Sequence, residues 1–245
     1  MWVNGSIDPY NRVTDEYIVA YIDILGIKNE IQQEDNKFLA LNKLYNLYTF
    51  SINSTRQIAW SESSNIIFKI FSDNILICQK LSTTIEKRSK EIKSLIYCVA
   101  HFQELAASDS VGWLVRGGIS IGQLFIDDIM VWGKALLASY NLESNIAIYP
   151  RIVLDTSVTE FLLSSEELHD FVRCDVDDIC FLNYLSMCHF CGEFLSLGFD
   201  LIQQNCNYSI NDRVYQKLCW HMNFINDELN AKNEKKDRSH RLSLI

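Results

Sequence analysis

Two aspartates, Asp23 and Asp73, are the residues whose surroundings most suggest chemistry. Asp23 lies near the end of the apolar run EYIVAYIDIL (16–25), and Asp73 lies at the turn of the apolar hairpin KIFSDNILIC (69–78). Ser, Asp and Asn favour tight turns, so turn formation alone is one explanation for Asp73. A charge at the end of a buried strand is costly unless it is paired. Two carboxylates held side by side repel each other, and a bound Mg²⁺ or Mn²⁺ relieves that repulsion.

Three cations are candidates to act with these carboxylates. Lys69 lies four residues before Asp73, where it either covers the strand edge with its aliphatic stem or contacts a ligand. Arg116 precedes two glycines that would let a ligand approach closely, but it could equally pair with one of the 31 acidic residues. Arg151 follows a proline at the start of a short apolar run, a position where an arginine is often a structural clamp.

The eight cysteines are scattered through mostly apolar surroundings. The N-terminus has no basic segment followed by an apolar one, so we expect no signal peptide, and we expect the cysteines to be reduced and buried. CHFC at 188–191 has the spacing of a zinc-binding pair. A structural zinc site needs a matching second pair, and Cys174 and Cys180 have five residues between them. The spacing therefore favours buried thiols over a zinc site.

The composition limits the classes of partner. The chain has 245 residues, of which 48% are hydrophobic, enough for the core of one large domain or of one domain with an appended lobe. The net charge of −9 argues against a broad nucleic-acid interface, although metal ions or a few cations can still offset the phosphates of a nucleotide. No apolar run approaches the roughly 18 to 20 residues of a membrane span. We expect a cytoplasmic protein that binds neither nucleic acid nor membrane.

The elements that must position these residues follow from hydrophobic periodicity. Short apolar runs indicate strands, and apolar residues three or four positions apart indicate helices. Their alternation predicts an α+β fold, one mixed sheet covered by helices, with the Asp23 strand and the Asp73 hairpin at its centre. Adjacent strand ends would then bring the two carboxylates together. In chain order we expect a strand at 16–25, a helix with apolar positions from Phe38 to Ile52, a hairpin at 66–78, a helix capped by Thr84, a strand at 111–126, a helix at 131–150, a strand at 151–155, a helix, a strand near 179–184 and a helical C-terminal third.

Several segments, taken in this order, resemble the class III nucleotidyl cyclase catalytic domain, and within it the pyrimidine cyclases of bacterial Pycsar anti-phage systems. They are YIDILGIK (21–28), FSDNI (71–75), RGGISIG (116–122), VWGKALLASYNLE (131–143) and YPRIVLD (149–155), with KLCWHMNF (217–224) similar to the family's tail. The resemblance implies a ferredoxin-like α+β catalytic domain at 15–185. An N-terminal segment at 1–14 would precede it, and a helical extension at 186–230 and a charged tail at 231–245 would follow.

The resemblance also implies roles for single residues around the first aspartate. Asp23 and Asp73 match the family's two metal-binding aspartates, with Ile24 as a further metal-site residue. The segment that includes Gly26 and Ile27 matches the one that cradles the triphosphate at the start of a helix. Two Mg²⁺ or Mn²⁺ ions would occupy each active site.

At four other positions the chain is compared with purine cyclases. Lys69 falls where those enzymes carry a lysine that reads the base. Met130 replaces the second base-reading residue, usually an aspartate, and Leu137 replaces an asparagine that holds the ribose. Asn141 replaces the arginine that stabilises the transition state. These departures disfavour a purine substrate.

The implied enzyme is a homodimer with composite sites, in which one protomer supplies the aspartates and the other the base-reading residues. It would convert UTP, or CTP, to cyclic UMP or cyclic CMP and pyrophosphate, and the product would signal to a separate effector in anti-phage defence. Arg116 or Arg151 would replace the missing arginine, or the metals would do most of that work while Asn141 donates one hydrogen bond. The missing arginine also leaves open a degenerate cyclase fold that binds nucleotide without turnover, as a sensor or scaffold.

Overall fold

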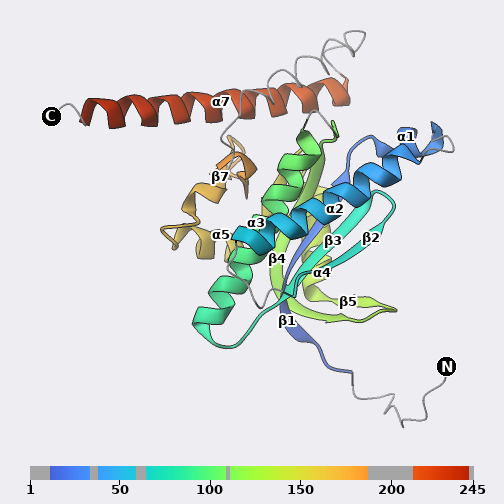
Figure 1. The fold of residues 1–245 in the computed structure, drawn as a ribbon. Coiled ribbons are helices and arrows are strands. Elements are labelled where there is room, and N and C mark those ends of the chain that lie inside the picture. The colour runs from blue at the N-terminus through green and yellow to red at the C-terminus, as the bar shows by residue number, and fades with distance from the viewer. Residues whose placement is uncertain (1–11, 34–37, 59–64, 109–110, 187–211, 243–245) are drawn as a thin grey trace, which may run out of the picture.

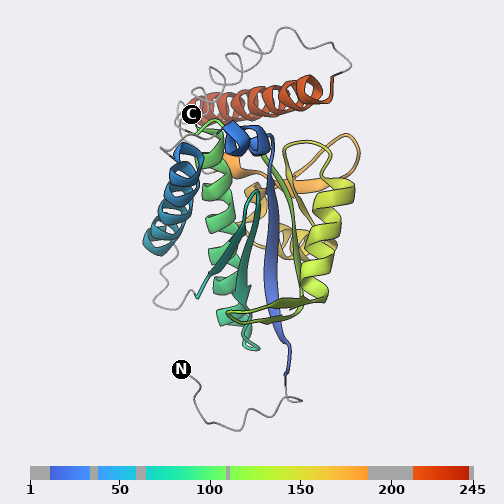
Figure 2. The ribbon, with the colours of Figure 1, turned by 90° about the vertical axis from the view of Figure 1, so that its right-hand side faces the viewer.

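The structure is a computed structural model that describes residues 12–33, 38–58, 65–108, 111–186 and 212–242 (Figure 1). Within these ranges eight strands form one mixed sheet, with the order β2-β3-β1-β4-β6-β8-β7 and with β5 paired to β4. Helices α2 (Leu39–Ile58) and α3 (Ile85–Ala107) cover one face of the sheet, and α4 (Lys134–Asn141) covers the other (Figure 2). The α+β fold predicted from the sequence is confirmed.

The centre of the sheet is β1 (Asp15–Ile24), which pairs antiparallel with both β3 (Asn74–Lys80) and β4 (Val115–Ile126). Its central residues are buried on both faces, as a continuous apolar run predicts. The hairpin prediction needs one correction, because only β3 is interior. β2 (Ile67–Phe71) forms the edge of the sheet, and its side chains are half-buried or exposed.

The side-chain pattern of α3 matches its predicted helical face. Thr84 occupies the N-cap position, although its side chain makes no capping hydrogen bond. The residues three and four apart that face the sheet are all buried, namely Ile92, Leu95, Val99, Phe102 and Ala106. They belong to the main hydrophobic core with the inward residues of β1 and β3. This core makes the sheet a rigid support for its strand ends.

The predicted helix at 131–150 is shorter than expected. Residues Val131–Gly133 form β5, a short strand paired with the end of β4. The helix α4 follows, and a π-helical turn, η1 (Leu142–Ile146), continues it. Gly133 has φ +152°, and a Cβ there would lie 2.3 Å from the carbonyl oxygen of Gln123. Glycine is therefore required where the hairpin passes into the helix.

The second half of the sheet is built from short strands. β6 (Ile152–Leu154) pairs parallel with β4, as a crossover through α4 allows. Asp155 then caps α5, because its carboxylate accepts a hydrogen bond from the Val158 amide. The remaining elements are α5 (Thr156–Leu163), a 3₁₀ turn (His169–Phe171), β7 (Val172–Cys174), β8 (Cys180–Leu182) and a second 3₁₀ turn (Tyr184–Ser186).

The prediction of uniformly reduced cysteines is wrong for one pair. Cys174 and Cys180 face each other across the β7–β8 hairpin with Cα atoms 4.0 Å apart, and they form a disulfide. Residues at a directly opposed antiparallel position can approach this closely, which spacing alone does not reveal. Cys78 and Cys98 are buried free thiols, as predicted. The CHFC segment lies outside the described residues.

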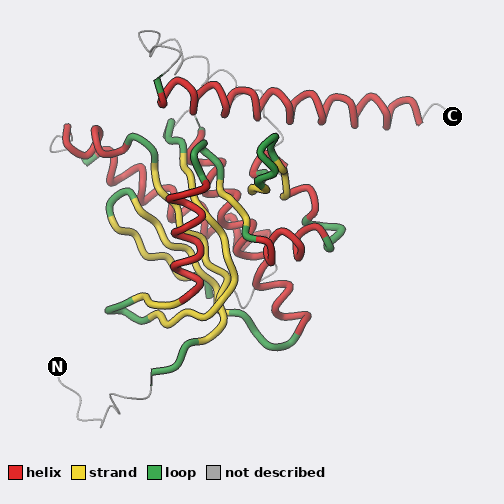
Figure 3. Tube along the Cα trace, turned by 180° about the vertical axis from the view of Figure 1, so that it is seen from behind, coloured by secondary structure: helices red, strands yellow, loops and turns green. Residues whose placement is uncertain are grey.

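The last described element is α7 (Arg213–Leu242), which crosses the end of the sheet where β1 ends (Figures 2 and 3). Its apolar residues Phe224 and Ile225 belong to the main core. The indole of Trp220 donates to Asp175 Oδ2 at 2.7 Å, and the hydroxyl of Tyr184 lies 2.8 Å from His221 Nε2. These contacts fix α7 against the body of the protein. None of the described helices has both the length and the apolar character needed to cross a membrane.

Candidate active site

Asp23 and Asp73 lie at the same end of the sheet, as the strand order predicted. Asp23 pairs in the ladder with Asn74, the neighbour of Asp73, and the amide of Ile24 donates to the carbonyl of Asp73 at 2.9 Å. Asp73 is buried, with 7% of its surface exposed, and Asp23 is half-buried. Two carboxylates thus project from adjacent strand ends beside one backbone turn.

That turn leads directly into a short helix. Gly26 adopts φ +82°, a conformation that glycine tolerates without strain, and α1 (Ile27–Gln33) begins at the next residue. Ile27 is buried and ties the start of α1 to the core. Of the two residues predicted to cradle a triphosphate, Gly26 therefore lies in the turn that follows Asp23 and Ile27 is the first residue of the helix.

Cations and amides hold both carboxylates. Arg116, at the start of β4, donates from Nε to Asp23 Oδ2 at 3.0 Å. Lys28 Nζ lies 3.4 Å from Asp73 Oδ2. The amide of Asn74 donates to Asp73 Oδ1 at 3.1 Å, while its own oxygen accepts from the hydroxyl of Tyr21 at 2.9 Å. Arg116 therefore pairs with an acid, which is one of the two alternatives that the sequence left open, and that acid belongs to the candidate site.

A third carboxylate, Glu143, lies at this site and was missed by the sequence analysis. Its Oε1 forms an ion pair with Arg116 Nη2 at 2.8 Å, although the angle is not that of a hydrogen bond. Only 4% of Glu143 is exposed. Burial raises the pKa of Glu143, the Arg116 charge lowers it, and the nearby Asp23 charge raises it further. Arg116 is thus the shared counter-ion of two acids.

The burial of Glu143 depends on a glycine in β4. A Cβ added to Gly118 would lie 2.4 Å from both Leu142 Cβ and the Ser139 carbonyl oxygen, and 3.2 Å from the Glu143 amide nitrogen. Only glycine lets the end of α4 and the turn η1 approach the sheet so closely. Packing against α4 and η1 therefore explains Gly118, the second glycine after Arg116. No local pattern marks Glu143, because a glutamate at the end of an amphipathic helix normally faces water.

The donor set suits a hard divalent cation shared with a ligand. Mg²⁺ prefers oxygen donors and often binds through one or two carboxylates plus substrate phosphates. Among the described residues there is no group of three or more His, Cys, Asp or Glu side chains that could hold a metal ion. Asp23 and Asp73, with the backbone carbonyl of Ile24, would instead supply a partial set of oxygen donors. Such a set fits Mg²⁺ or Mn²⁺ bound together with a nucleotide.

The base-reading candidates line a separate cavity of about 380 Å³ on the α4 face of the sheet. Lys69 on β2 is half-buried there, and Met130 is 54% exposed on the β4–β5 turn. Asp127 and Asp128 also line this cavity and were missed by the sequence analysis, although an acidic pair within the apolar run FIDDIMV was a visible signal. Hydrogen bonds from the Met130 and Ile129 amides lower the pKa of Asp127. The cavity therefore offers both a donor and acceptors.

Two α4 residues complete the candidates on this face. Leu137 and Asn141 are both exposed and are four positions apart, so they share one side of the helix. Within the described part of the chain, the Asn141 side chain makes no hydrogen bond. Glu143, two residues further on, is the one that reaches Asp23 through Arg116. Any contact of Asn141 with substrate stays a prediction.

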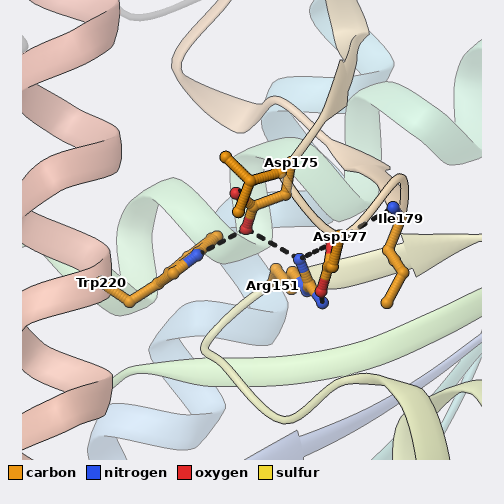
Figure 4. A network of polar contacts seen from close by, with 6 residues as sticks. Arg151, Asp175, Asp177, Ile179 and Trp220 are labelled. Carbon is orange, nitrogen blue, oxygen red and sulfur yellow. Dashed lines mark hydrogen bonds and ion pairs between the residues drawn. The ribbon is translucent and has the colours of Figure 1, made fainter.

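Arg151 precedes β6 beside the start of β4, where its carbonyl accepts a hydrogen bond from the Gly117 amide at 3.1 Å, but its side chain does not pair with the acids of the site. It is fully buried, donates to Asp175 Oδ2 at 2.8 Å, and contacts both carboxylate oxygens of Asp177 at 3.1 and 2.5 Å (Figure 4). The aromatic rings around its guanidinium, with centroids 5.6 to 5.9 Å away, are those of Tyr149, Phe181 and Trp220. This arginine also lowers the pKa of Asp177 by hydrogen bonding. The geometry favours the structural-clamp explanation over a role at phosphorus.

Comparison with known proteins identifies the fold. No protein-family model and no curated protein matches the sequence. The monomeric guanylyl cyclase domain of the RhoGC fusion protein from the aquatic fungus Blastocladiella emersonii is 13% identical, with a TM-score of 0.51 over 69% of this chain and 95% of that chain. The adenylyl cyclase CyaB from P. aeruginosa is 14% identical, with a TM-score of 0.43 over 69% of this chain and 94% of that chain. The chain therefore has the fold of class III nucleotidyl cyclase catalytic domains.

Proposed function

We propose that this protein is a pyrimidine nucleotide cyclase that converts UTP, or CTP, to cyclic UMP or cyclic CMP and pyrophosphate. The observation that carries the proposal is the pair Asp23 and Asp73 at adjacent strand ends of a class III cyclase fold. These two residues also lie in the segments that resemble the family's metal motifs. The cyclic nucleotide would act in the cytoplasm on a separate effector as part of anti-phage defence.

The chemistry follows from what these side chains can hold. Asp23, Asp73 and the Ile24 carbonyl would hold Mg²⁺ or Mn²⁺, two ions per site, which when bound neutralise triphosphate charge and lower the pKa of the ribose 3′-hydroxyl. The 3′ oxygen forms a bond to the α-phosphorus in line with the breaking bond to the bridging oxygen, and pyrophosphate leaves. Arg116 keeps Asp23 oriented and supplies a fixed positive charge beside it. The hydroxyl proton passes to water.

A homodimer would complete the site across the face of the sheet that carries α4 and the Lys69 cavity. Large apolar side chains are exposed around the Lys69 cavity, and an isolated soluble domain rarely gathers so many on one face. A second copy covering this face would bring its Lys69, Met130 and Asn141 toward the first copy's aspartates. The exposed apolar residues on this face are Phe71, Ile129, Met130, Trp132, Leu137 and Tyr140.

The Lys69 cavity is the proposed base pocket. A lysine donates only, which suits the carbonyl oxygens of uracil and the O2 or N3 of cytosine. Met130 fills space where a purine would need depth. The carboxylates of Asp127 and Asp128 add acceptors, which the 4-amino group of cytosine can use and uracil cannot. Base selectivity between UTP and CTP therefore depends on how close these acids come to the bound base.

Two observations favour a different function. Asn141 stands where purine cyclases carry the transition-state arginine, and Arg116 occupies a carboxylate that would bind metal. A degenerate fold that binds nucleotide without turnover, as a sensor or scaffold, would retain these features. The presence of both aspartates argues for catalysis.

The test is incubation of the purified protein with each of the four NTPs and Mn²⁺, with product identification by mass. We expect cyclic UMP or cyclic CMP, and no product from the Asp73→Asn variant. Cyclisation of ATP at a rate comparable to that of UTP or CTP would contradict the pyrimidine specificity and indicate a purine cyclase. Nucleotide binding without any cyclic product would support the sensor. Plaque counts on cells that carry the wild type or Asp73→Asn would test the defence role.

A further inference from the structure

A second polar cavity, of about 320 Å³, lies at the Asp23 end of the sheet under the first turns of α7. Arg116 from β4 and Arg213 and Lys217 from α7 contribute three cations to its lining, and Ser144 and Tyr149 contribute hydroxyl groups. The volume is within the range of about 300–1,000 Å³ that is usual for ligand pockets. In a chain with a net charge of −9, three cations around one cavity are a local exception.

Within the described residues, the side chains of Arg213 and Lys217 form no ion pair and no hydrogen bond. They are four positions apart and share one side of the helix, a spacing at which like charges destabilise a helix. Burial lowers the pKa of the half-buried Lys217, the Arg116 and Arg213 charges lower it further, and Asp23 and Glu143 oppose them. An anion in the cavity would relieve this repulsion.

The position of these cations is set by the packing of α7. Trp220, three residues after Lys217, stacks on Tyr149 at a centroid distance of 5.5 Å and donates to Asp175. His221, four residues after Lys217, contacts the hydroxyl of Tyr184. Residues three and four apart share a helix face, so the anchored face of α7 is also the face that carries the cations. These contacts therefore fix the part of α7 that carries both cations over the end of the sheet.

The third cation connects this cavity to the candidate metal site. Arg116 lines the cavity and donates to Asp23 through Nε at 3.0 Å. A ligand bound against Arg116 therefore lies next to the carboxylate proposed to hold the metal. Arginine and lysine together suit phosphate oxygens, the first by its planar fork of donors and the second as a point charge.

We propose that Arg213 and Lys217 of α7, with Arg116, form an anion pocket for the β- and γ-phosphates of the substrate and for the pyrophosphate that leaves. The proposal rests on the cyclase function proposed above. In this proposal the C-terminal helix supplies positive charge near the phosphates, since Asn141 on α4 carries none. Arg213 and Lys217 would position the triphosphate and stabilise the negative charge of the pyrophosphate as it leaves.

The first test measures binding of inorganic pyrophosphate by calorimetry, without divalent metal, to the full chain and three variants. Loss of a hydrogen bond to a charged group predicts about 10- to 100-fold weaker binding for Lys217→Gln and for Arg213→Gln. Lys217→Arg keeps the charge and should retain most of the affinity. Lys87→Gln, which removes an exposed lysine at the far end of α3, is the matched control and should bind as the wild type does.

The outcomes separate this proposal from the proposed function. Wild-type affinity for pyrophosphate in both glutamine variants, or no pyrophosphate binding by the wild type, overturns the anion pocket. If cyclisation proceeds while Lys217→Gln leaves the NTP KM and the pyrophosphate affinity unchanged, the pocket is wrong and the cyclase stands. If no NTP is cyclised but pyrophosphate binding depends on Lys217 and Arg213, the pocket stands and the cyclase is wrong. Arg213 is exposed, so Arg213→Gln should fold even if Lys217→Gln does not.

Discussion

Replacing Arg116 by methionine tests the electrostatic core of the site without any assumption about activity. The change removes one charge and keeps the approximate length of the side chain. It leaves Asp23 and Glu143 without the counter-ion that they share at 3.0 and 2.8 Å. Because Glu143 is buried, its charge then has little access to water.

The expected loss of stability can be placed between two limits. Breaking a fully buried ion pair by removing one partner costs about 3–5 kcal/mol, whereas an exposed pair contributes about 0–1 kcal/mol. The side chain of Arg116 is 26% exposed and that of Glu143 is 5% exposed, so the pair is near the buried limit. We expect about 2–3 kcal/mol at pH 7. For a chain of this size, that lowers the melting temperature by about 4–12 °C.

The pH dependence has a definite sign. Burial places the pKa of Glu143 above its ordinary value in the folded protein, so the ionised side chain costs stability as pH rises through that pKa. Removing Arg116 raises this pKa further, because Arg116 is the charge that lowers it. Protonation of Glu143 at lower pH then removes part of the cost. The stability gap between wild type and Arg116→Met should therefore be smaller at pH 5 than at pH 7.

Urea unfolding at the two pH values measures the gap, and two further variants sharpen the comparison. Arg88→Met is the matched control, because Arg88 pairs with the more exposed Glu16 and its loss should cost at most about 1 kcal/mol. The double variant Arg116→Met/Glu143→Gln should be more stable than Arg116→Met alone. A cost for Arg116→Met no larger than for Arg88→Met, or a gap that does not shrink at pH 5, would refute the shared counter-ion.

Four further outcomes are expected. Asp73→Asn should abolish cyclase activity with Mn²⁺ while leaving the melting temperature within a few degrees; turnover close to wild type would contradict the metal assignment. Lys69→Met should raise the KM for the pyrimidine nucleotide by roughly tenfold or more, because a donor to the base is lost; an unchanged KM would remove Lys69 from the base pocket. Mixing Asp73→Asn with Lys69→Met should restore activity in heterodimers, because one of the two composite sites then keeps both Asp73 and Lys69. No rescue despite confirmed subunit exchange would exclude composite sites. Gly118→Ala should cost about 1–3 kcal/mol in urea unfolding through overpacking against Leu142, and wild-type stability would show that the approach of η1 to the sheet is not tight.

Much of the scaffold could be predicted from the sequence because its determinants are local. Residues 17–22 are apolar at every position, a pattern typical of a strand buried on both faces. The α3 stripe recurs every three or four residues and forms the core-facing side of one helix. Adjacent strand ends can place Asp23 and Asp73 side by side, and β1 and the hairpin are adjacent in the structure.

The tertiary structure alone decided which partners each charged side chain has. Arg116 and Arg151 look alike in sequence, since each stands at the start of an apolar run, yet one borders the Asp23 site and the other is enclosed by Asp175, Asp177 and aromatic rings. Those partners lie 24 to 93 residues away along the chain. No periodicity within one element specifies which distant element will pack against it.

The same reason explains the residues that sequence reasoning missed. Glu143 is buried because Gly118, in another strand, leaves room for the turn that carries it. Lys217 faces Arg116 because Trp220 is anchored to Asp175 on a third element. Burial and electrostatics are properties of the assembled surfaces, so the sequence determined the strands, the helices and the two aspartates, and the packing between elements determined which charges act together.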